Sequence, residues 1–310
     1  MMILDPFALP GRFYKGNLHT HSNRSDGALE VEAVCSAYRA AGYDFIALTD
    51  HFLHRYGHPI VDTRALRDDR FTTIIGAELH LPATALGETW HILAVGLPLD
   101  FAPPSDGETA SAIARRAREA GAFVTIVHPA WYGLTAEDAA MIPDAHAIEV
   151  YNHTSAVKTD RGDGTALFDQ LLAQGRRITA CATDDAHFSE PDHFGGWVMV
   201  KAEANEPEAL LAALKAGHFY STQGPELRDV RVEDGHLIVE SSAVVSVVAL
   251  GHGTGAKAVH GHSMTRAEVP LDRVLNSPWI RAAVIDAAGK RAWSNPIWVG
   301  AHGKNPRVAG

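Results

Sequence analysis

Histidine and carboxylate side chains recur at the ends of the apolar runs of this chain, from His19-Thr20-His21 to Asp185-Ala186-His187. Between these two motifs the series continues with Asp26, Asp50-His51, Glu78, His91 and His128. Neutral imidazole and carboxylate are the ligands that hold Zn²⁺, Mn²⁺ or Fe²⁺. Side chains two apart on a strand share a face, so each of the two terminal motifs can direct both of its ligands at one ion. The series predicts a hydrolytic metal centre.

The elements that must position these side chains alternate between strands and helices up to about residue 220. We expect strands from residue 18 and over 45–48, 73–77, 91–95, 123–127, 147–151 and 178–182. Helical spacing covers 28–41, 105–120, 136–141, 165–174 and 207–216. This alternation favours a parallel α/β sheet with crossover helices. If the sheet closes, it forms a barrel whose site lies at the carboxyl ends of its strands, where most candidate ligands fall.

The pattern changes from about Pro225. Short strand-like runs, separated by glycine and polar turns, replace the helical spacing at 230–232, 237–240, 244–250, 268–269 and 279–285. These runs predict a small antiparallel β-sandwich. Residues 302–310 are expected to be a frayed tail.

Composition limits the classes of partner. The net charge of −10 argues against nucleic acid, because contact with phosphate backbones needs a basic surface. Cys35 and Cys181 lie inside an expected helix and an expected strand, where packing is the favoured role. The N-terminus lacks the pattern of a signal peptide, and no apolar run has the length of a membrane span. We therefore expect a cytoplasmic protein with a small-molecule substrate and no membrane partner; a homo-oligomer is left open.

The ordered motifs resemble the polymerase and histidinol phosphatase (PHP) family over residues 13–222. They are His19-x-His21, Ser25-Asp26-Gly27, Thr49-Asp50-His51, Glu78, His91, His128-Pro129 and Asp185-x-His187. The resemblance implies a distorted (β/α)7 TIM-like barrel over 13–224, with a small antiparallel β-sandwich domain over 225–301. The stretches 217–225 and 293–297 resemble the branch that includes carbaryl hydrolases, in which a β-domain often follows.

The resemblance also implies a ligand set for two or three divalent ions of Zn, Mn or Fe. A first ion would be held by His19, His21, Glu78 and Asp185. Glu78 would bridge to a second ion, held also by His91 and His128. A third would use Asp26, His51 and His187. Asp26 stands where some relatives carry histidine. Asp184 is expected to support the ligands, and Asp50 to orient a ligand imidazole or the strand end.

This ligand set implies hydrolysis by a metal-bridged hydroxide, with Glu78, Asp185 and His187 as the catalytic residues. Coordination lowers the pKa of water toward about 7, and a residue not committed to metal passes a proton to the leaving group. A small phosphomonoester or phosphodiester is the favoured substrate, by analogy with the wider family. A carboxylesterase, amidase or carbamate hydrolase is the alternative, and a non-catalytic metal-binding scaffold is the third reading.

Substrate contacts are expected at the rim of the pocket. Arg55, flanked by His54 and His58, can grip phosphate or carboxylate, although a solvated loop explains these residues equally well. Trp131-Tyr132 and Tyr151 follow or end strands and can either line an aromatic pocket or pack against neighbouring elements.

Overall fold

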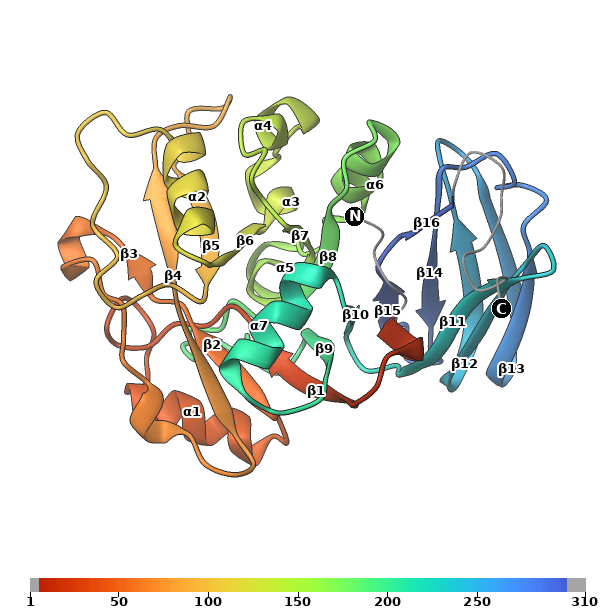
Figure 1. Cartoon of the computed structure of the whole chain (residues 1–310), viewed down its shortest axis with the longest axis horizontal. Coiled ribbons are helices and arrows are strands. Elements are labelled where there is room, and N and C mark those ends of the chain that lie inside the picture. Colours follow the sequence, from red (N-terminus) through yellow and green to blue (C-terminus); the bar gives the residue numbers. More distant parts are fainter. Residues whose placement is uncertain (1–5, 300–310) are drawn as a thin grey trace.

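The computed structural model describes residues 6–299 as an α/β part followed by an all-β part (Figure 1). The α/β part contains the strands β1 (Arg12–Asn17), β2 (Phe45–Leu48), β3 (His51–Phe52), β4 (Thr72–Leu81), β5 (Trp90–Val95), β6 (Phe123–Ile126), β7 (Ala147–Asn152), β8 (Thr179–Thr183), β9 (Trp197–Ala202) and β10 (Phe219–Thr222). Its helices are α1 (Val31–Ala40), α2 (Ala110–Glu119), α3 (Pro129–Tyr132), α4 (Ala136–Ala140), α5 (His153–Thr159), α6 (Thr165–Ala173) and α7 (Pro207–Ala216).

The helices cover the sheet with apolar faces that the sequence encodes. In α2 the buried residues Ala110, Ile113, Ala114 and Ala117 recur at helical spacing, and they pack in the same core as β5 and β6. Cys35 in α1 and Cys181 in β8 are both buried and unbonded to each other, as a packing role requires.

The sheet differs from the predicted barrel in strand direction and closure. β1, β2 and β4 are parallel, and so are β6, β7 and β8, but β5 runs antiparallel to both β4 and β6. β9 runs antiparallel to β1, and β10 runs antiparallel to β9. The reason is that β4 returns directly into β5 through a short loop, without the crossover helix that a parallel neighbour needs. The fold is mixed α/β, and the expected closed parallel barrel is wrong in these respects.

Within residues 6–299 no backbone ladder joins β8 to β10. Polar side chains connect these two strands instead. The Ser221 hydroxyl accepts a hydrogen bond from Ala182 N at 2.9 Å and donates to Ala180 O at 2.7 Å. The Asn295 side chain accepts from Ala180 N at 2.9 Å and donates to Phe219 O at 2.8 Å. These two polar side chains hold β8, at one end of the open sheet, against β10.

The all-β part continues the same sheet. Its strands are β11 (Leu227–Glu233), β12 (His236–Leu250), β13 (Ala256–Pro270), β14 (Trp279–Ile285), β15 (Arg291–Ser294) and β16 (Ile297–Trp298). β15 pairs antiparallel with β10 and so connects the two parts by backbone hydrogen bonds. The register of β12 shifts between residues 240 and 246, so that β12 pairs first with β11 and then with β14. These strands enclose a core of their own that includes Val239, Val247 and Val284.

The two parts also contact each other through an ion pair. Arg281 of β14, which is buried, donates to both carboxylate oxygens of Asp169 on α6 at 2.7 and 2.6 Å. Trp279 and Trp293 lie in the same core cluster as β5, β6 and β7. The C-terminal strands therefore have a core of their own and also pack against the α/β part.

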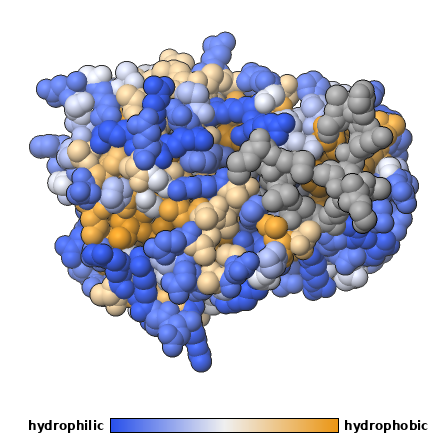
Figure 2. Space-filling model, viewed as in Figure 1, coloured by the Kyte–Doolittle hydropathy of each residue, from blue (hydrophilic) through white to orange (hydrophobic). Residues whose placement is uncertain are grey.

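Hydrophilic residues cover most of the described surface on the face seen in Figure 2. Within residues 6–299, no helix has both the length and the apolar character needed to cross a bilayer. The tail expected over 302–310 lies outside the described residues.

Candidate metal centre

The candidate ligands from distant segments converge beyond the ends of β1 and β8. Asp185 N donates to His19 O at 2.8 Å and His21 N donates to Ala186 O at 2.9 Å, so backbone bonds join the two ligand-bearing segments. The rings of His19 and His21 lie 5.2 Å apart, centroid to centroid. Residues separated by more than 160 positions are thus held side by side where the sequence motifs predicted a metal centre.

Glu78 lies at the middle of the cluster. Its Oε1 is 2.8 Å from His91 Nδ1 and 3.1 Å from His128 Nε2, and its Oε2 is 2.6 Å from His51 Nδ1. The same carboxylate lies 3.5 Å from His19 Nε2. Because Glu78 is fully buried and faces imidazoles on several sides, it has the placement that a bridging ligand needs.

Asp185 forms a second carboxylate contact. Its Oδ1 is 2.9 Å from His21 Nε2 and 3.2 Å from His19 Nε2. These three residues offer ligand atoms that all lie within 4.8 Å of one another. They match the first expected metal position, in which Glu78 would be the fourth ligand.

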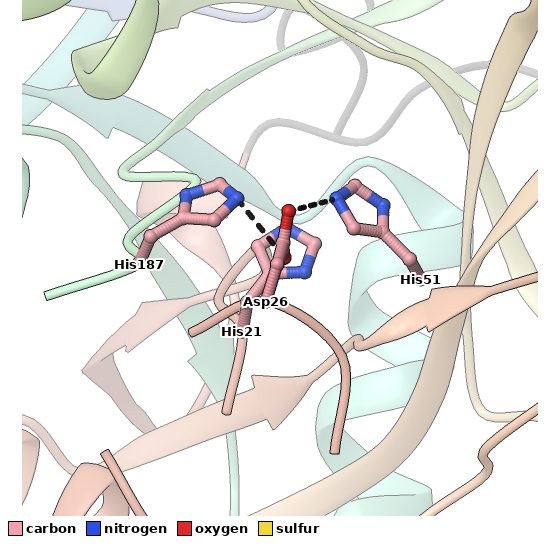
Figure 3. Close-up of side chains that lie close together, drawn as sticks. All are labelled: His21, Asp26, His51 and His187. Atoms are coloured by element: carbon pink, nitrogen blue, oxygen red, sulfur yellow. Dashed lines mark ion pairs between the residues drawn. The ribbon is translucent and has the colours of Figure 1, made fainter. Parts of the chain in front are cut away.

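Asp26 brings together a third group, with His21, His51 and His187 (Figure 3). Its two carboxylate oxygens lie 3.3 Å from His51 Nε2 and 3.5 Å from His187 Nε2. The Ser25-Asp26-Gly27 turn depends on glycine, because a Cβ at Gly27 would lie 2.7 Å from the backbone of His21. The structure therefore brings Asp26 together with His51 and His187, the two histidines with which the sequence grouped it.

Electrostatics divide the imidazoles into two kinds. Burial opposes protonation of His51, but the charges of Glu78 and Asp26 outweigh it and raise its pKa to about 10. Burial likewise opposes protonation of His19, and nearby carboxylates raise its pKa well above the usual range. Burial, together with neighbouring imidazoles, lowers the pKa of His21 to about 3. A cation entering the site would therefore displace protons from His19 and His51 and meet His21 already neutral.

The residues present fit a bound cation. His19 Nε2 and His21 Nδ1 are buried and make no hydrogen bond within residues 6–299. Buried polar atoms normally have a partner, and leaving one without a partner costs about 1–3 kcal/mol. Imidazole nitrogens and a carboxylate oxygen grouped in this way are the donor set of a Zn²⁺, Mn²⁺ or Fe²⁺ site.

Two of the predicted ligands have an unusual backbone conformation. His128 has φ 32° and Asp185 has φ 58°, in the left-handed region that residues other than glycine seldom adopt. Such conformations persist only where the surrounding structure enforces them, and they gather at functional sites. The backbone conformation at these two positions therefore fits a role in placing the two side chains.

His80 and Glu149 belong to the cluster but were missed from the sequence. His80 Nε2 lies 2.9 Å from His51 Nδ1, and burial lowers the pKa of its imidazole to about 2. The two-residue spacing from Glu78 on β4 puts His80 on the same face, and this signal could have identified it. Glu149 is a carboxylate inside the apolar strand β7, and its Oε1 lies 2.8 Å from His19 Nδ1.

The two auxiliary aspartates hold loops. Asp50 accepts hydrogen bonds from Ser22 N, Ser22 Oγ and Ser25 Oγ, so it fixes the turn that leads to Asp26 rather than an imidazole. Asp184 accepts from Tyr38 Oη and from three successive backbone N–H groups over 194–196. Asp184 thus holds the 194–196 loop, and its support of the ligands stays a prediction.

The predicted substrate residues are more scattered. Arg55 and His54 are exposed on a 3₁₀ turn, His54–Tyr56, and the Arg55 guanidinium lies 4.6 Å from the ring of Tyr56. His58 packs with its ring 4.9 Å from that of Phe52. Tyr56 in turn stacks on His51 at 6.4 Å, so this loop reaches the rim of the cluster.

Tyr151 lies elsewhere. Its hydroxyl is hydrogen-bonded to His153 Nδ1 at 2.8 Å. Its ring stacks on that of Trp293, with 6.2 Å between the centroids, in the contact between the two parts of the chain. Its described contacts place it with the C-terminal strands and give no support to the predicted role in substrate binding.

Solved structures that are similar to this chain include one two-domain protein. A two-domain protein containing a predicted PHP-like metal-dependent phosphoesterase, from Bacteroides vulgatus, is 16% identical with a TM-score of 0.53, covering 90% of this chain and 93% of its own. A proposed metal-dependent phosphoesterase from Bifidobacterium adolescentis is 14% identical with a TM-score of 0.41, over 57% and 89% of the two chains. An amidohydrolase from Chromobacterium violaceum, with bound sulfate and no metal, is 15% identical with a TM-score of 0.35, over 56% and 87%.

No curated protein matches the chain. The first of these structures supports the two-domain fold over nearly the whole length. The model of the PHP domain matches residues 17–187, which span more than half of the chain and every candidate ligand from His19 to His187. This chain belongs to the PHP domain family.

Proposed function

We propose that this protein is a metal-dependent hydrolase of small phosphomonoesters or phosphodiesters. The observation that carries the proposal is the convergence of the predicted ligands on Glu78 and Asp185, with buried ligand atoms left without hydrogen bonds. The Bacteroides vulgatus relative, described as containing a PHP-like metal-dependent phosphoesterase, supports the same class of reaction.

Two or three divalent ions of Zn, Mn or Fe would be held by the ligand set that the family resemblance implies. His19, His21, Glu78 and Asp185 would hold one ion, Glu78 with His91 and His128 a second, and Asp26, His51 and His187 a third. Such ions would acidify a water molecule and polarise the oxygen of the bond to be cleaved.

The protein's own residues orient the ligands and move protons. Glu149 accepts from His19 Nδ1, which leaves Nε2 of that ring as the atom facing the centre. When two ions bind and His187 is not a ligand, its partly exposed side chain, with Nδ1 held 2.8 Å from Asp185 O, is the one best placed to give a proton to a leaving group. Catalytic roles for Glu78, Asp185 and His187 are part of this proposal.

The alternative function is a carboxylesterase, amidase or carbamate hydrolase, as in the carbaryl-hydrolase-like branch. The aromatic side chains beside His91 and His128 favour it, since they suit a less charged substrate than a phosphate ester. The substrate would be a small molecule in either case. We propose no nucleic-acid or membrane partner, and a cytoplasmic setting.

The experiment is hydrolysis of matched p-nitrophenyl substrates by the metal-reconstituted full chain. The set comprises a phosphomonoester, a phosphodiester, a carboxylate ester and a carbamate, with His19→Ala as the blank. Phosphoester turnover that the blank loses supports the proposal. Ester or carbamate turnover alone favours the alternative, and metal binding without any turnover favours a scaffold.

Metal content provides a second readout. Glu78→Ala and Asp185→Ala remove the two central carboxylates, and we expect each to lose both bound metal and turnover, measured by atomic emission and the same assay. Full activity in either variant would contradict the bridged site. His218→Ala, which removes a half-exposed imidazole outside the cluster, is the matched control.

A further inference from the structure

Exposed apolar side chains lie at one side of the candidate metal centre. Trp131 is 39% exposed and Leu86 is 71% exposed, high fractions for residues of this kind. The Leu86 side chain lies 3.9 Å from where a Cβ would sit on Gly133, two residues after Trp131. The two side chains therefore flank the same end of α3, and covering them with an apolar group would be favourable.

The aromatic pair of α3 contacts the predicted ligands directly. The Trp131 ring lies 5.1 Å from that of His128 and 6.0 Å from that of His91. The Tyr132 ring lies 5.0 and 5.3 Å from the same two imidazoles. A molecule that stacks on Trp131 would thus place the atoms attached to its stacked group beside the candidate metal centre.

Tyr132 supplies a polar group at this place. Its hydroxyl oxygen is buried and makes no hydrogen bond within residues 6–299. A buried tyrosine hydroxyl usually finds a partner, because one left without a partner has lost its bond to water. A polar atom of a bound molecule would satisfy it.

The loop that carries Leu86 is fixed to the same segment. Ala85 N donates to Asp138 Oδ1 at 2.7 Å, while Asp138 Oδ2 accepts from Thr135 N and Thr135 Oγ1 at the start of α4. This aspartate caps its own helix and holds the β4–β5 loop against it. The loop that carries Leu86 is consequently fixed to α4 by hydrogen bonds.

We propose that Trp131, Leu86 and Tyr132 form a subsite for a flat aromatic group of the substrate, next to the bond that is cleaved. The aromatic ring lies against Trp131 and Leu86, and Tyr132 Oη donates a hydrogen bond to a polar atom beside it. Arg161 Nη1, 3.4 Å from Trp131 O, adds a cation near this site for an anionic substrate. The substrate class that the subsite selects is therefore an aryl ester, and that this ester is a phosphoester rests on the proposed function.

Binding is measured first, independently of turnover. The full chain is titrated with 1-naphthyl phosphate and with glycerol 2-phosphate, by calorimetry, with and without added Zn²⁺. We expect tighter binding of the naphthyl ester and, because an aromatic contact contributes about 0.5–1.5 kcal/mol, a loss of about three- to tenfold in Trp131→Ala. Trp131→Phe, which keeps an aromatic face, should restore part of that affinity.

Matched leucines control for general loss of apolar surface. Leu86→Ala should weaken naphthyl phosphate binding, whereas Leu275→Ala, which removes a 65% exposed leucine from the all-β part, should leave it unchanged. Tyr132→Phe should weaken binding while keeping the ring. Equal affinity for the two phosphate esters, or equal effects of the two leucine changes, would overturn the subsite.

Turnover separates this proposal from the proposed function. Trp131→Ala should lower kcat/KM for the naphthyl ester more than it lowers kcat/KM for the glycerol ester. This result would support both the aromatic subsite and the proposed phosphoesterase function. Tight naphthyl binding that needs Trp131, without hydrolysis of any phosphoester, would sink the phosphoesterase assignment and leave the aromatic subsite standing.

Discussion

Glu149 accepts a hydrogen bond from Nδ1 of His19 across 2.8 Å, although the two residues are 130 positions apart. The carboxylate also accepts from Thr183 Oγ1, Asn152 Nδ2 and the backbone N–H of His128. It therefore ties together the carboxyl ends of β7 and β8 and the segments that follow β1 and β6. A carboxylate behind a ligand imidazole fixes its tautomer and ring orientation.

Replacing Glu149 by Gln should weaken metal binding while leaving every predicted ligand in place. The amide offers one acceptor oxygen in place of two, so at least one of the four donors loses its partner. Changes behind a ligand typically cost about 10–100-fold in metal affinity. Competition with a chromophoric chelator measures this, with the exposed Glu137→Gln as control. An affinity equal to that of the parent would show that Glu149 serves packing only.

His80→Ala should affect the metal position that uses His51. His80 Nε2 is 2.9 Å from His51 Nδ1, so its removal frees that ring to rotate away from Asp26. We expect about 10–100-fold weaker binding at this one position. Atomic emission after dialysis would show a lower ratio of metal to protein, and anomalous diffraction would locate the loss. The ratio in His218→Ala should not change.

Asn295→Ala should destabilise the whole α/β part. The change leaves Ala180 N and Phe219 O without their side-chain partner, and each such buried group costs about 1–3 kcal/mol. Urea denaturation followed by circular dichroism gives the free energy of unfolding. The exposed Asn276→Ala is the matched control.

Removal of residues 226–310 should impair metal retention, because it also removes the Asn295 side chain that bonds Ala180 N and Phe219 O. A truncated chain that keeps its metal would contradict this prediction.

His146→Asn should make stability less dependent on acid pH. Burial, followed by the charges of Arg118 and Lys215, lowers the pKa of His146 from 6.5 to about 4. Between pH 6.5 and 4 the imidazole of residue 146 is therefore protonated in the unfolded chain but neutral in the folded chain. The contribution of this group to the free energy of unfolding is fully present above pH 6.5 and is lost as pH falls from 6.5 toward 4. Asparagine can still accept from Val124 N, as His146 Nδ1 does at 3.1 Å. Unfolding free energies measured between pH 7 and 4.5 should decline less in the variant; parallel curves would contradict this.

Strands that are buried on both faces were predictable from the sequence. The apolar run 45–48 forms β2 over the same residues, and the run 147–151 forms β7 with one residue added. Strand ends were less predictable where direction changes. Glu78 lies within β4, and His91 lies near the start of β5, because these strands form an antiparallel hairpin that a parallel interpretation cannot anticipate.

Partly exposed elements left weaker signals. β13 covers Ala256–Pro270, whereas only 268–269 were expected to be a strand, because most of its side chains are exposed or half-buried and give no apolar run. Glu149 was missed because a single polar residue in a strand carries no motif, and His80 was missed although its spacing from Glu78 marks the same strand face. Their roles depend on partners far away in the sequence, which only the three-dimensional structure brings together.

The Asn295 contact with Ala180 N joins residues 115 positions apart. A ribosome makes β8, and the Asp185-Ala186-His187 motif after it, well before it makes the side chain that holds β8 in place. The N-terminal motifs emerge earlier still. In the growing chain the ligands therefore exist before the framework that aligns them, and a chain stalled before Asn295 would offer its histidines and carboxylates to a metal without the geometry to select one.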